Sequence, residues 1–592
     1  MKHKLRSRAL TVVLSLMLII GLMSATVFAA PVNPTTVQVN GTDILNGTDH
    51  TVSCGRGTAT YDPGTNTLTL NNAEINYQQN DNSAGAILFN GDLNINLVGE
   101  NTITSATCGI RGTNAGALTI TGDSLTIDCT YYGIGIPIAG ADITIDDADI
   151  DITAKGVNDF TGVGIQAGGV LSIKNGAYID VTDVSHHPII GNAGIEITDS
   201  TLYAQQYTDY YAAIRSENSV FISNSTVEAR ANSESPAIWT GDDLSSPPTP
   251  GHITISNGSD VTLYSESATA VYALFGDIDI ENSAVEVSSE DNAAIYSYEG
   301  TISMTDSVVK AQAYSDYYTI SATKGISLTG VWLDNVDNEA SLSDSDTVEN
   351  SVIIDYEQGR AVGNPVITRD VELRNGVKLT IPEQTSLTMA EGVVFKNNGT
   401  VNLKGNFINN NAIVLCADSS HAGGTATCTA KAVCALCGNE YGDLLPHNFE
   451  NGKCIVCDAI DPDFKPVIIT GANGIWQKGS KDGLSFTSNA AFTDFLKVQV
   501  DNKDLDASDY TVKEGSTIVT LKAEYLETLS LGKHTLAIVS ETGTATTEFT
   551  IKAATDSSAQ TGDDGNIALY VGLAILAAAG VAAVGIQRRR EQ

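Results

Sequence analysis

Pairs of apolar residues separated by one residue recur along the first half of the chain at a nearly constant distance. They are Leu68/Leu70, Leu93/Ile95, Leu118/Ile120, Ile143/Ile145, Leu171/Ile173, Ile195/Ile197, Val220/Ile222, Ile253/Ile255, Ile278/Ile280, Ile302/Met304 and Ile326/Leu328. Most steps are 24 or 25 residues long, and the one step of 33 residues contains a proline-rich insert at 241–251. A period of two is the pattern of a strand with one buried face. We therefore expect one short strand at the same place in every repeat.

Other positions keep the same register. A second apolar position follows each pair, as at Ile150 and Val227, and a third comes later, as at Ile134 and Ile238. Asn, Asp or Gly, which tolerate left-handed backbone, stands two residues after the pair in nearly every repeat. Three strands in each turn of about 24 residues predict a right-handed parallel β-helix over 30–335. In such a helix, successive pairs should stack about 5 Å apart, as in the series Ile195, Val220, Ile253 and Ile278.

The rest of the body changes its rhythm twice. Residues 336–415 keep the solenoid pattern with shorter spacing, which predicts irregular coils that close the open end. Residues 464–552 alternate like the strands of a small antiparallel β-sandwich.

The two ends carry targeting features. Four basic residues, a short apolar run and small residues predict a signal peptide over 1–29. An uncleaved anchor helix is the alternative, but the apolar run is short for a span. Residues 567–586 hold no charge and are long enough to cross a bilayer, and the basic tail 587–592 should stay in the cytoplasm. Residues 553–566 indicate a flexible linker.

The linker contains the pentapeptide SAQTG at 558–562. Pentapeptide, apolar span and basic tail together resemble the sortase sorting signal of Gram-positive bacteria, whose usual pentapeptide is LPXTG. Thr561 and Gly562 match that signal and would flank the cleaved bond, whereas Ser558 and Ala559 depart from it. The resemblance implies an exported protein at the cell surface, and the departure leaves open whether the anchor is the cell wall or the membrane.

The net charge excludes one class of partner. Asp and Glu number 70 against 32 Lys and Arg, for a formal net charge of −38. Because phosphate binding requires clustered Lys and Arg, we expect no nucleic-acid partner. Solubility at a crowded surface is the plain interpretation, and calcium between Asp-rich loops is the alternative. The best acidic cluster, Asp146, Asp147, Asp149 and Asp151, includes a turn-column position, which favours a solvated turn.

Nine cysteines are unevenly distributed. Those in the repeats are Cys54, Cys108 and Cys129, which are expected to be buried thiols or one disulfide with one left over. The pairs Cys434/Cys437 and Cys454/Cys457 have the spacing of a four-cysteine structural zinc ribbon within a module at 416–460. Disulfides are the alternative outside the cell. Four further residues lie close enough to offer a second site or to substitute as ligands: Cys416, His421, Cys428 and His447.

Three segments resemble known families. VQVNGTDILNGTDHTVSCGRGTATYDPGTNTLTLNNA, at 37–73, resembles the opening of Gram-positive surface proteins of the carbohydrate-binding-domain type, a likeness that extends over about 32–335. GGTATCTAKAVCALCGNEYGDLLPHNFENGKCIVC, at 423–457, resembles Cys/His-rich repeats of such surface proteins. The segment 474–516 resembles immunoglobulin-like modules found beside carbohydrate-active enzymes. The predicted fold class is therefore all-β: a β-helix, a zinc-ribbon-like module and an immunoglobulin-like sandwich, followed by one transmembrane helix.

The expected function is carbohydrate binding without catalysis. No Gly-His-Gly or Arg-x-Lys motif of polygalacturonase-like sites occurs, Arg is scarce in the coils, and His186–His187 lacks an evident partner. Exposed tyrosines stack on sugar rings, although tyrosines also close corners between strands. We expect a surface adhesin for an extracellular polysaccharide or host glycan, with a β-helix lyase or glycoside hydrolase, or a purely structural stalk, as alternatives. The candidate sugar-binding residues fall 13 to 16 residues after the apolar pair of their repeat: Tyr131, Tyr132, Tyr210, Tyr211, Tyr317 and Tyr318.

Overall fold

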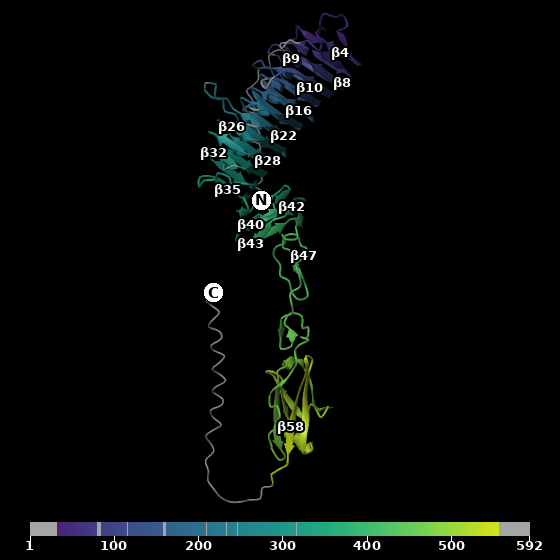
Figure 1. The fold of residues 1–592 in the computed structure, drawn as a ribbon, viewed down its shortest axis with the longest axis vertical. Helices are drawn as coiled ribbons and strands as arrows, with labels where there is room; N and C mark the ends of the chain where they lie inside the picture. The colour runs from purple at the N-terminus through teal and green to yellow at the C-terminus, as the bar shows by residue number, and fades with distance from the viewer. Residues whose placement is uncertain are drawn as a thin grey trace, which may run out of the picture. The chain divides into compact units, whose positions relative to one another are not determined.

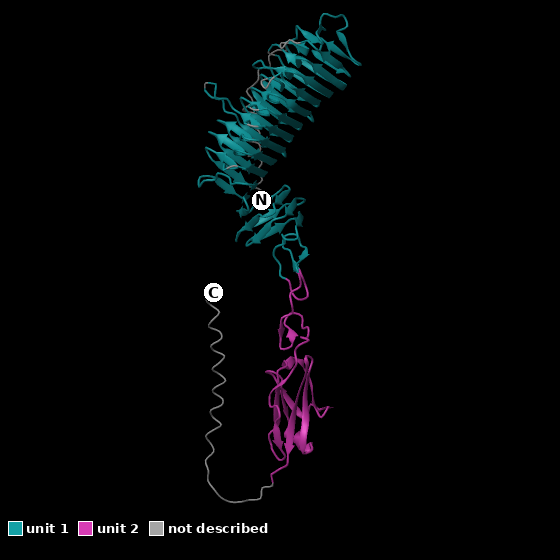
Figure 2. Ribbon diagram, viewed as in Figure 1, with its two compact units in different colours: residues 1–425, 432–442 teal, residues 426–431, 443–592 magenta. Residues whose placement is uncertain are grey.

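The structure is a computed structural model that describes residues 32–79, 84–114, 116–157, 161–208, 210–232, 234–245, 247–314 and 316–555. The predicted signal peptide, the sorting motif with Thr561 and Gly562, the apolar span and the basic tail lie outside these residues. No helix within the described ranges is long and apolar enough to cross a membrane. The chain forms two compact units (Figure 2): unit 1 comprises residues 1–425 and 432–442, and unit 2 comprises 426–431 and 443–592.

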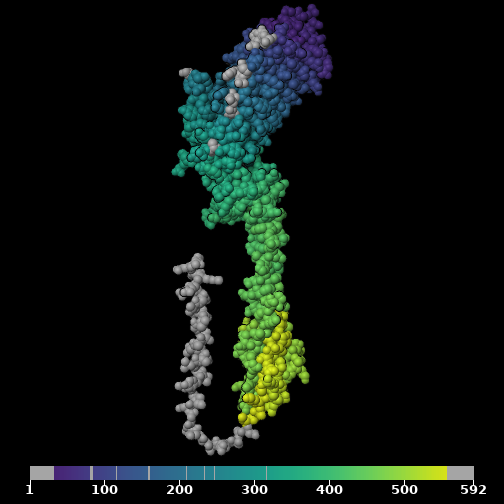
Figure 3. All heavy atoms as spheres, viewed as in Figure 1, coloured from purple at the N-terminus to yellow at the C-terminus, as the bar shows by residue number. Residues whose placement is uncertain are grey.

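Most of unit 1 is a parallel β-solenoid (Figure 1), and the described residues form about 14 solenoid coils. Each regular coil has three strands, so equivalent strands of successive coils form three parallel ladders. In the space-filling view the colour changes steadily along the stack, so neighbours in sequence are neighbours in space (Figure 3).

First strands of the coils are β5 (Thr67–Asn71), β12 (Ile143–Asp146), β15 (Val170–Lys174), β18 (Gly194–Thr198), β21 (Val220–Ser223), β24 (Ile253–Ser256), β27 (Ile278–Glu281), β30 (Ile302–Thr305), β33 (Ile326–Thr329) and β35 (Thr347–Glu349). Second strands are β6 (Glu74–Tyr77), β13 (Asp149–Ala154), β16 (Tyr178–Val184), β19 (Thr201–Gln206), β22 (Thr226–Ala231), β25 (Asp260–Ser265), β28 (Ala284–Ser289), β31 (Val308–Ala313), β34 (Trp332–Asn335) and β36 (Ser351–Asp355). Two long strands, β8 (Leu93–Ser105) and β10 (Leu118–Cys129), run through both positions.

Third strands form a separate sheet, called here the third-strand sheet: β7 (Gly85–Phe89), β9 (Cys108–Gly112), β11 (Tyr132–Ile136), β14 (Val163–Ala167), β17 (Ile189–Gly191), β20 (Ile214–Ser216), β23 (Ile238–Thr240), β26 (Val271–Leu274), β29 (Ile295–Tyr298) and β32 (Ile320–Ala322). The hairpin β1 (Val37–Val39) and β2 (Thr42–Asp43) pairs antiparallel with β7 and ends this sheet. Strand β3 (Thr51–Cys54) pairs antiparallel with β4 (Gly57–Asp62), and β4 pairs antiparallel with β5, so this hairpin caps the first strands.

The predicted stacking is confirmed. Ile195 pairs with Val220, Val220 with Ile253, and Ile253 with Ile278, and each is at most 1% exposed. Each fully buried aliphatic side chain of this kind contributes about 1.5–3 kcal/mol to folding. These columns therefore supply the continuous core.

The first repeat departs from the predicted register. Leu68 pairs with Ile95, two residues beyond the expected Leu93. Because β5 is also paired antiparallel with β4, the cap fixes its position. A shift of two residues keeps the same side chains facing inward, so the core tolerates it.

The predicted turn column is left-handed wherever it holds Asn or Asp. The backbone φ angles lie between 44° and 59° at Asn72, Asp147, Asn175, Asp199, Asn224, Asn257, Asn282 and Asp306. Beside this column runs a ladder of buried serines, in which the Ser200 N–H donates to Ser225 Oγ at 3.2 Å and the Ser225 N–H donates to Ser259 Oγ at 3.3 Å. The ladder pairs backbone groups that the turns would otherwise leave buried without partners.

A short second solenoid follows the long one. β36 pairs antiparallel with β37 (Gln358–Val362), and this reversal starts new parallel ladders with their own core. Its other strands are β38 (Val366–Ile367), β39 (Val371–Leu373), β40 (Lys378–Ile381), β41 (Ser386–Met389), β42 (Val394–Asn397), β43 (Thr400–Leu403), β44 (Asn406–Asn409) and β45 (Ile413–Cys416).

The remaining elements are small antiparallel pairs and two sheets. The Cys/His-rich region holds β46 (Ala432–Val433), β47 (Glu440–Tyr441), β48 (Phe449–Glu450) and β49 (Lys453–Cys454). In unit 2, one sheet contains β50 (Ile468–Thr470), β52 (Leu484–Ser488), β56 (Ile518–Leu521) and β55 (Tyr510–Lys513). The other contains β51 (Ile475–Gln477), β58 (Gly543–Lys552), β57 (Gly532–Ser540), β53 (Phe495–Val500) and β54 (Lys503–Asp504). A 3-10 turn, Phe492–Asp494, and α2 (Ala523–Thr528) join strands of these sheets, which share a core around Phe486 and Phe549.

Candidate metal centres and an aromatic face

Two groups of three cysteines and one histidine gather in the Cys/His-rich region, with the potential ligand atoms of each group within 4.8 Å of one another. Cluster 1 lies in unit 1 and cluster 2 in unit 2. The structure thus divides the four cysteines predicted as one site into two pairs, and each pair is completed by one further cysteine and one histidine. Cluster 1 consists of Cys416, His421, Cys434 and Cys437, and cluster 2 of Cys428, His447, Cys454 and Cys457.

Both cysteine pairs lie on the same kind of turn. The residue after each pair has left-handed backbone, Gly438 with φ 76° and Asp458 with φ 59°. The N–H of Gly438 donates to the Cys434 carbonyl, and that of Asp458 to the Cys454 carbonyl, each at 2.9 Å. The turn places both sulfurs of a pair in one group.

The distances fit a tetrahedral metal ion rather than a disulfide. Cys428 Sγ lies 3.7 Å from Cys454 Sγ, Cys437 Sγ lies 3.5 Å from His421 Nδ1, and Cys457 Sγ lies 3.3 Å from His447 Nδ1. Tetrahedral zinc, with Zn–S of about 2.3 Å and Zn–N of about 2.0 Å, separates its ligand atoms by about 3.5–3.8 Å. A disulfide needs about 2.05 Å between sulfurs. Each group could therefore hold a metal such as zinc.

Backbone donors favour the thiolate form of one cysteine in each group. Burial acts to raise the pKa of Cys434, but hydrogen bonds from the N–H groups of Cys437 and Ala422 outweigh it and lower the pKa to about 6. The N–H of Val456 is the main cause that lowers the pKa of Cys454 to about 6. Thiolates are the form that binds metal, so these donors suit a metal site.

The surroundings of the two clusters differ. Cys434 and Leu436, each 2% exposed, belong to the core of the short solenoid, and Cys416 is the last residue of β45. In cluster 2 the corresponding turn is open to solvent, with Ile455 58% and Val456 57% exposed. Cluster 1 is therefore part of a hydrophobic core, whereas cluster 2 has none beneath its turn.

A second feature is a row of aromatic side chains on the outward face of the third-strand sheet. Arg215 pairs in register with Trp239, Trp239 with Tyr272, and Tyr272 with Tyr296. The Arg215 guanidinium carbon lies 4.5 Å from the centre of the Trp239 ring, and the centres of the Tyr272 and Tyr296 rings are 5.8 Å apart. Trp239, Tyr272 and Tyr296, called here the aromatic ladder, line a depression of about 350 Å³ together with the polar residues Glu234 and Asn292.

The predicted tyrosine pairs lie elsewhere on the same sheet. Tyr132 begins β11, whereas the other two pairs lie in the loops that precede β20 and β32. All three pairs lie at or just before the N-terminal ends of third strands, but two strands lie between the first and second pairs and three between the second and third in the stacking order. Tyr210, Tyr317 and Tyr318 are 64%, 56% and 47% exposed.

The three remaining tyrosines of those pairs are half-buried, and two have clear neighbours. The Arg111 guanidinium carbon is 4.6 Å from the Tyr132 ring, and the Tyr211 ring lies 3.7 Å from that of His186. Burial lowers the pKa of His186 to about 4, which keeps this ring neutral. His186 therefore packs against an aromatic partner that the sequence did not reveal.

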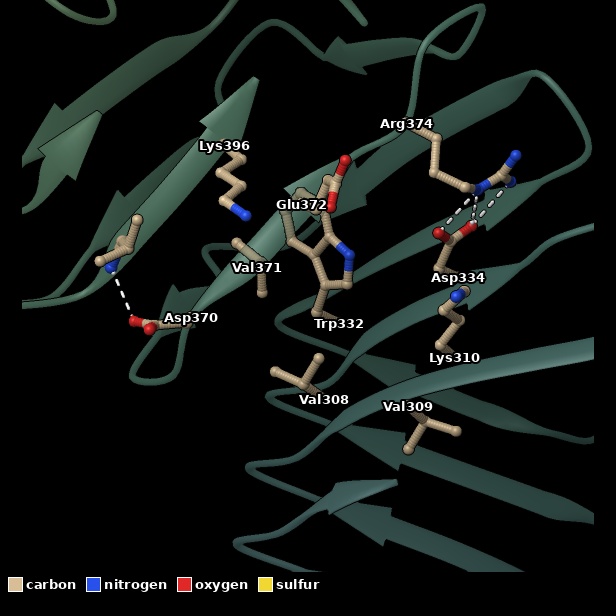
Figure 4. Close-up of a pocket in the computed structure, with 11 residues that line it drawn as sticks. Val308, Val309, Lys310, Trp332, Asp334, Asp370, Val371, Glu372, Arg374 and Lys396 are labelled. Carbon is tan, nitrogen blue, oxygen red and sulfur yellow. Dashed lines mark hydrogen bonds and ion pairs between the residues drawn. The ribbon is translucent and has the colours of Figure 1, made fainter. Parts of the chain in front are cut away.

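A pocket of about 420 Å³ in unit 1 is a wedge between the long and short solenoids (Figure 4). Its apolar lining includes Val308, Trp332 and Val371. Arg374 closes one side through a bidentate ion pair with Asp334, whose side chain is 6% exposed. The cations and anions that line the wedge are equal in number, so its charge selects no class of ligand.

Of the acidic cluster at 146–151, Asp146 and Asp147 fit the solvated turn, whereas Asp149 and Asp151 lie in β13. Asp147 has φ 52°, and Asp146 accepts a hydrogen bond from the Asn175 side chain at 2.8 Å and lies 3.5 Å from Lys174 Nζ. None of these carboxylates belongs to either metal group. Calcium stays a prediction.

No family model, curated protein or solved structure matches this chain.

Proposed function

We propose that this chain is an exported, non-enzymatic surface protein that binds an extended extracellular glycan along its solenoid. The observation that carries the proposal is the aromatic ladder, in which half-buried rings on successive coils share one depression. Trp and Tyr rings present an apolar face to a sugar ring, and tyrosine adds a hydroxyl group that reaches water or ligand. Successive rings repeat along the rod, as the residues of a linear glycan repeat along the polymer.

The other parts support a surface role in this proposal. The solenoid is a right-handed β-helix, the two sheets of unit 2 form an immunoglobulin-like spacer, and the C-terminal segment is a wall or membrane anchor. The two Cys/His clusters hold structural zinc, because four protein ligands leave no open position for catalysis. The anchored chain thereby presents its binding face outside the cell.

Replacing Trp239 by Ala tests the proposal. Loss of one stacking ring should weaken binding to a long polysaccharide by about 1 kcal/mol, roughly fivefold in Kd, and Tyr272→Ala should act in the same direction. Tyr314→Ala is the matched control, because Tyr314 is 60% exposed and outside the ladder. Tyr210→Ala and Tyr317→Ala measure the contribution of the predicted pairs. Unchanged polysaccharide affinity in Trp239→Ala and Tyr272→Ala would remove the ladder from the proposal.

One observation favours the polysaccharide hydrolase or lyase as second candidate. Asp151 and Asp180 pair in register on the outward face of the second strands, and Asp180 lines a depression of about 260 Å³ with Tyr178, Tyr203 and Arg230. Burial, then the neighbouring Asp149, raises the pKa of Asp151, and burial, then Asp151, raises that of Asp180. Shortening of a polysaccharide with turnover, abolished by Asp180→Asn, would establish this candidate in place of the first.

A further inference from the structure

The ligands of the two clusters alternate along the chain. Cys428, a cluster 2 ligand, lies between His421 and Cys434, which are both cluster 1 ligands. The boundary between the units follows the same alternation, because residues 426–431 belong to unit 2 while the chain before and after them belongs to unit 1. One ligand of cluster 2 is therefore carried on a loop whose two ends belong to the unit of cluster 1.

The base of this loop is closed by the segments that form cluster 1. The Ala435 N–H donates to the Ala422 carbonyl at 2.8 Å, and the Ala422 N–H donates to Cys434 Sγ at 3.4 Å. A Cβ atom on Gly424 would lie 2.2 Å from the Val433 carbonyl oxygen, so the two ends of the loop are in contact. An ion at cluster 1 would hold these two segments together.

The tip of the loop has a defined conformation around Cys428. Thr427 Oγ1 accepts the N–H of Ala430 at 2.9 Å, and the Thr427 carbonyl accepts the N–H of Leu445 at 2.9 Å. These bonds fix the backbone on which Cys428 meets the rest of cluster 2.

The hairpin of β48 and β49 carries part of cluster 2, and Lys453 ties it to Asp494 and Glu541, but cluster 2 has no hydrophobic core to order it. No residue of 443–465 belongs to any of the three buried hydrophobic clusters of the described residues. A short segment without a core needs a metal or another staple to hold one shape. If the base of the loop opened, Cys428 would lie in a long flexible segment, and ordering it again would cost conformational entropy.

We propose that metal binding at the two clusters is coupled through Cys428. An ion at cluster 1 closes the base of the loop, places Cys428 for cluster 2 and so tightens the second site, and by linkage the second ion tightens the first. This inference rests on the metal binding proposed above. It makes the segment between the solenoids and the sheets of unit 2 a cooperative metal-dependent element rather than two independent modules.

The test uses the full chain with zinc alone. Native mass spectrometry counts the bound ions, and competition with a chromogenic chelator gives their affinities. The unaltered chain should bind two ions, and Cys437→Ser, which breaks only cluster 1, should weaken the ion that remains at cluster 2 by about tenfold or more. Cys54→Ala is the control, because Cys54 is a buried thiol outside both clusters, and it should change neither affinity.

A second variant retains all eight ligands. Insertion of about four Gly/Ser residues between Lys431 and Ala432 loosens the loop without touching cluster 1. Two ions should still bind, with the cluster 2 affinity reduced toward that of Cys437→Ser. Unchanged cluster 2 affinity in both variants, with one ion bound to Cys437→Ser and two to the insertion variant, would overturn the coupling and leave the metal sites standing. An unaltered chain that binds no zinc would overturn both.

Discussion

Removal of Arg374 should destabilise the short solenoid strongly. Arg374 Nε and Nη2 each lie 2.8 Å from an oxygen of Asp334, and the Asp334 side chain is only 6% exposed. Arg374→Met would leave that carboxylate buried without its cation, and breaking such a pair costs about 3–5 kcal/mol. The Arg374 side chain is itself 24% exposed, so solvent screens part of the interaction and we expect a value near the lower limit, about 3 kcal/mol.

Hydrogen exchange is the suitable assay because it reports local opening. Amides of β40 and β42 should exchange through an opening whose free energy falls by about 3 kcal/mol in Arg374→Met. The double variant Arg374→Met/Asp334→Leu should recover most of the loss, since apolar side chains already line the wedge. Lys310→Met is the control: its ion pair with Glu286 is half-exposed and should contribute less than about 1 kcal/mol. A double variant as unstable as Arg374→Met would refute the explanation by an unpaired buried charge.

Three further predictions concern separate parts of the molecule. The backbone φ angle is 56° at Asn257, a conformation that glycine tolerates and valine does not. In urea titrations, Asn257→Val should therefore lower the free energy of unfolding by about 1–3 kcal/mol, and Asn257→Gly by much less. Equal losses in the two variants would contradict a backbone cause. In unit 2, burial acts to lower the pKa of His534, but the hydrogen bond to Asp501 outweighs it and raises the pKa above its ordinary value of 6.5. Burial likewise acts to raise the pKa of Asp501, and the bond to His534 lowers it below 3.8. The pair should therefore stabilise the domain most between about pH 4 and 6.5, losing the His534 contribution as pH rises and that of Asp501 as pH falls. Thermal unfolding of His534→Gln across this range measures that window, and a difference from the unaltered chain that does not vary with pH would exclude the pair as its source. The thiols of Cys108 and Cys129 are at most 4% exposed, and burial is the main cause that raises their pKa values. Both should therefore react with a maleimide only after unfolding. Rapid labelling of these two cysteines in the native protein would show that their coils open.

Most of the solenoid could be predicted because one physical requirement repeats in every coil. Each inward column must be apolar and each tight turn must accept left-handed backbone, so Ile253 and Asn257 are recognisable from residue type and spacing alone. The register of Leu68 could not be predicted in this way. It depends on the antiparallel partner β4, and period-two alternation cannot distinguish registers that differ by two residues.

The candidate sites were harder to predict from the sequence, for two different reasons. The residue after each inward residue of a third strand must face outward, so Trp239, which follows Ile238, could have been found from the alternation itself. The division of the cysteines could not be found from spacing, because Cys434/Cys437 and Cys454/Cys457 have the separation of a single four-cysteine site. Only the folded chain shows that Cys428 crosses to the other cluster.

The parallel stacking of the long solenoid has an evolutionary consequence. Because each coil contacts mainly its two neighbours, duplication or deletion of a segment of one coil length would join equivalent positions and leave the columns in register. A change of any other length must be accommodated outside the columns, as the insert at 241–251 is: Val220 still pairs with Ile253 across it. A lineage of such proteins could thus vary the length of the solenoid in whole coils by ordinary recombination between repeats, while selection acted separately on the outward side chains.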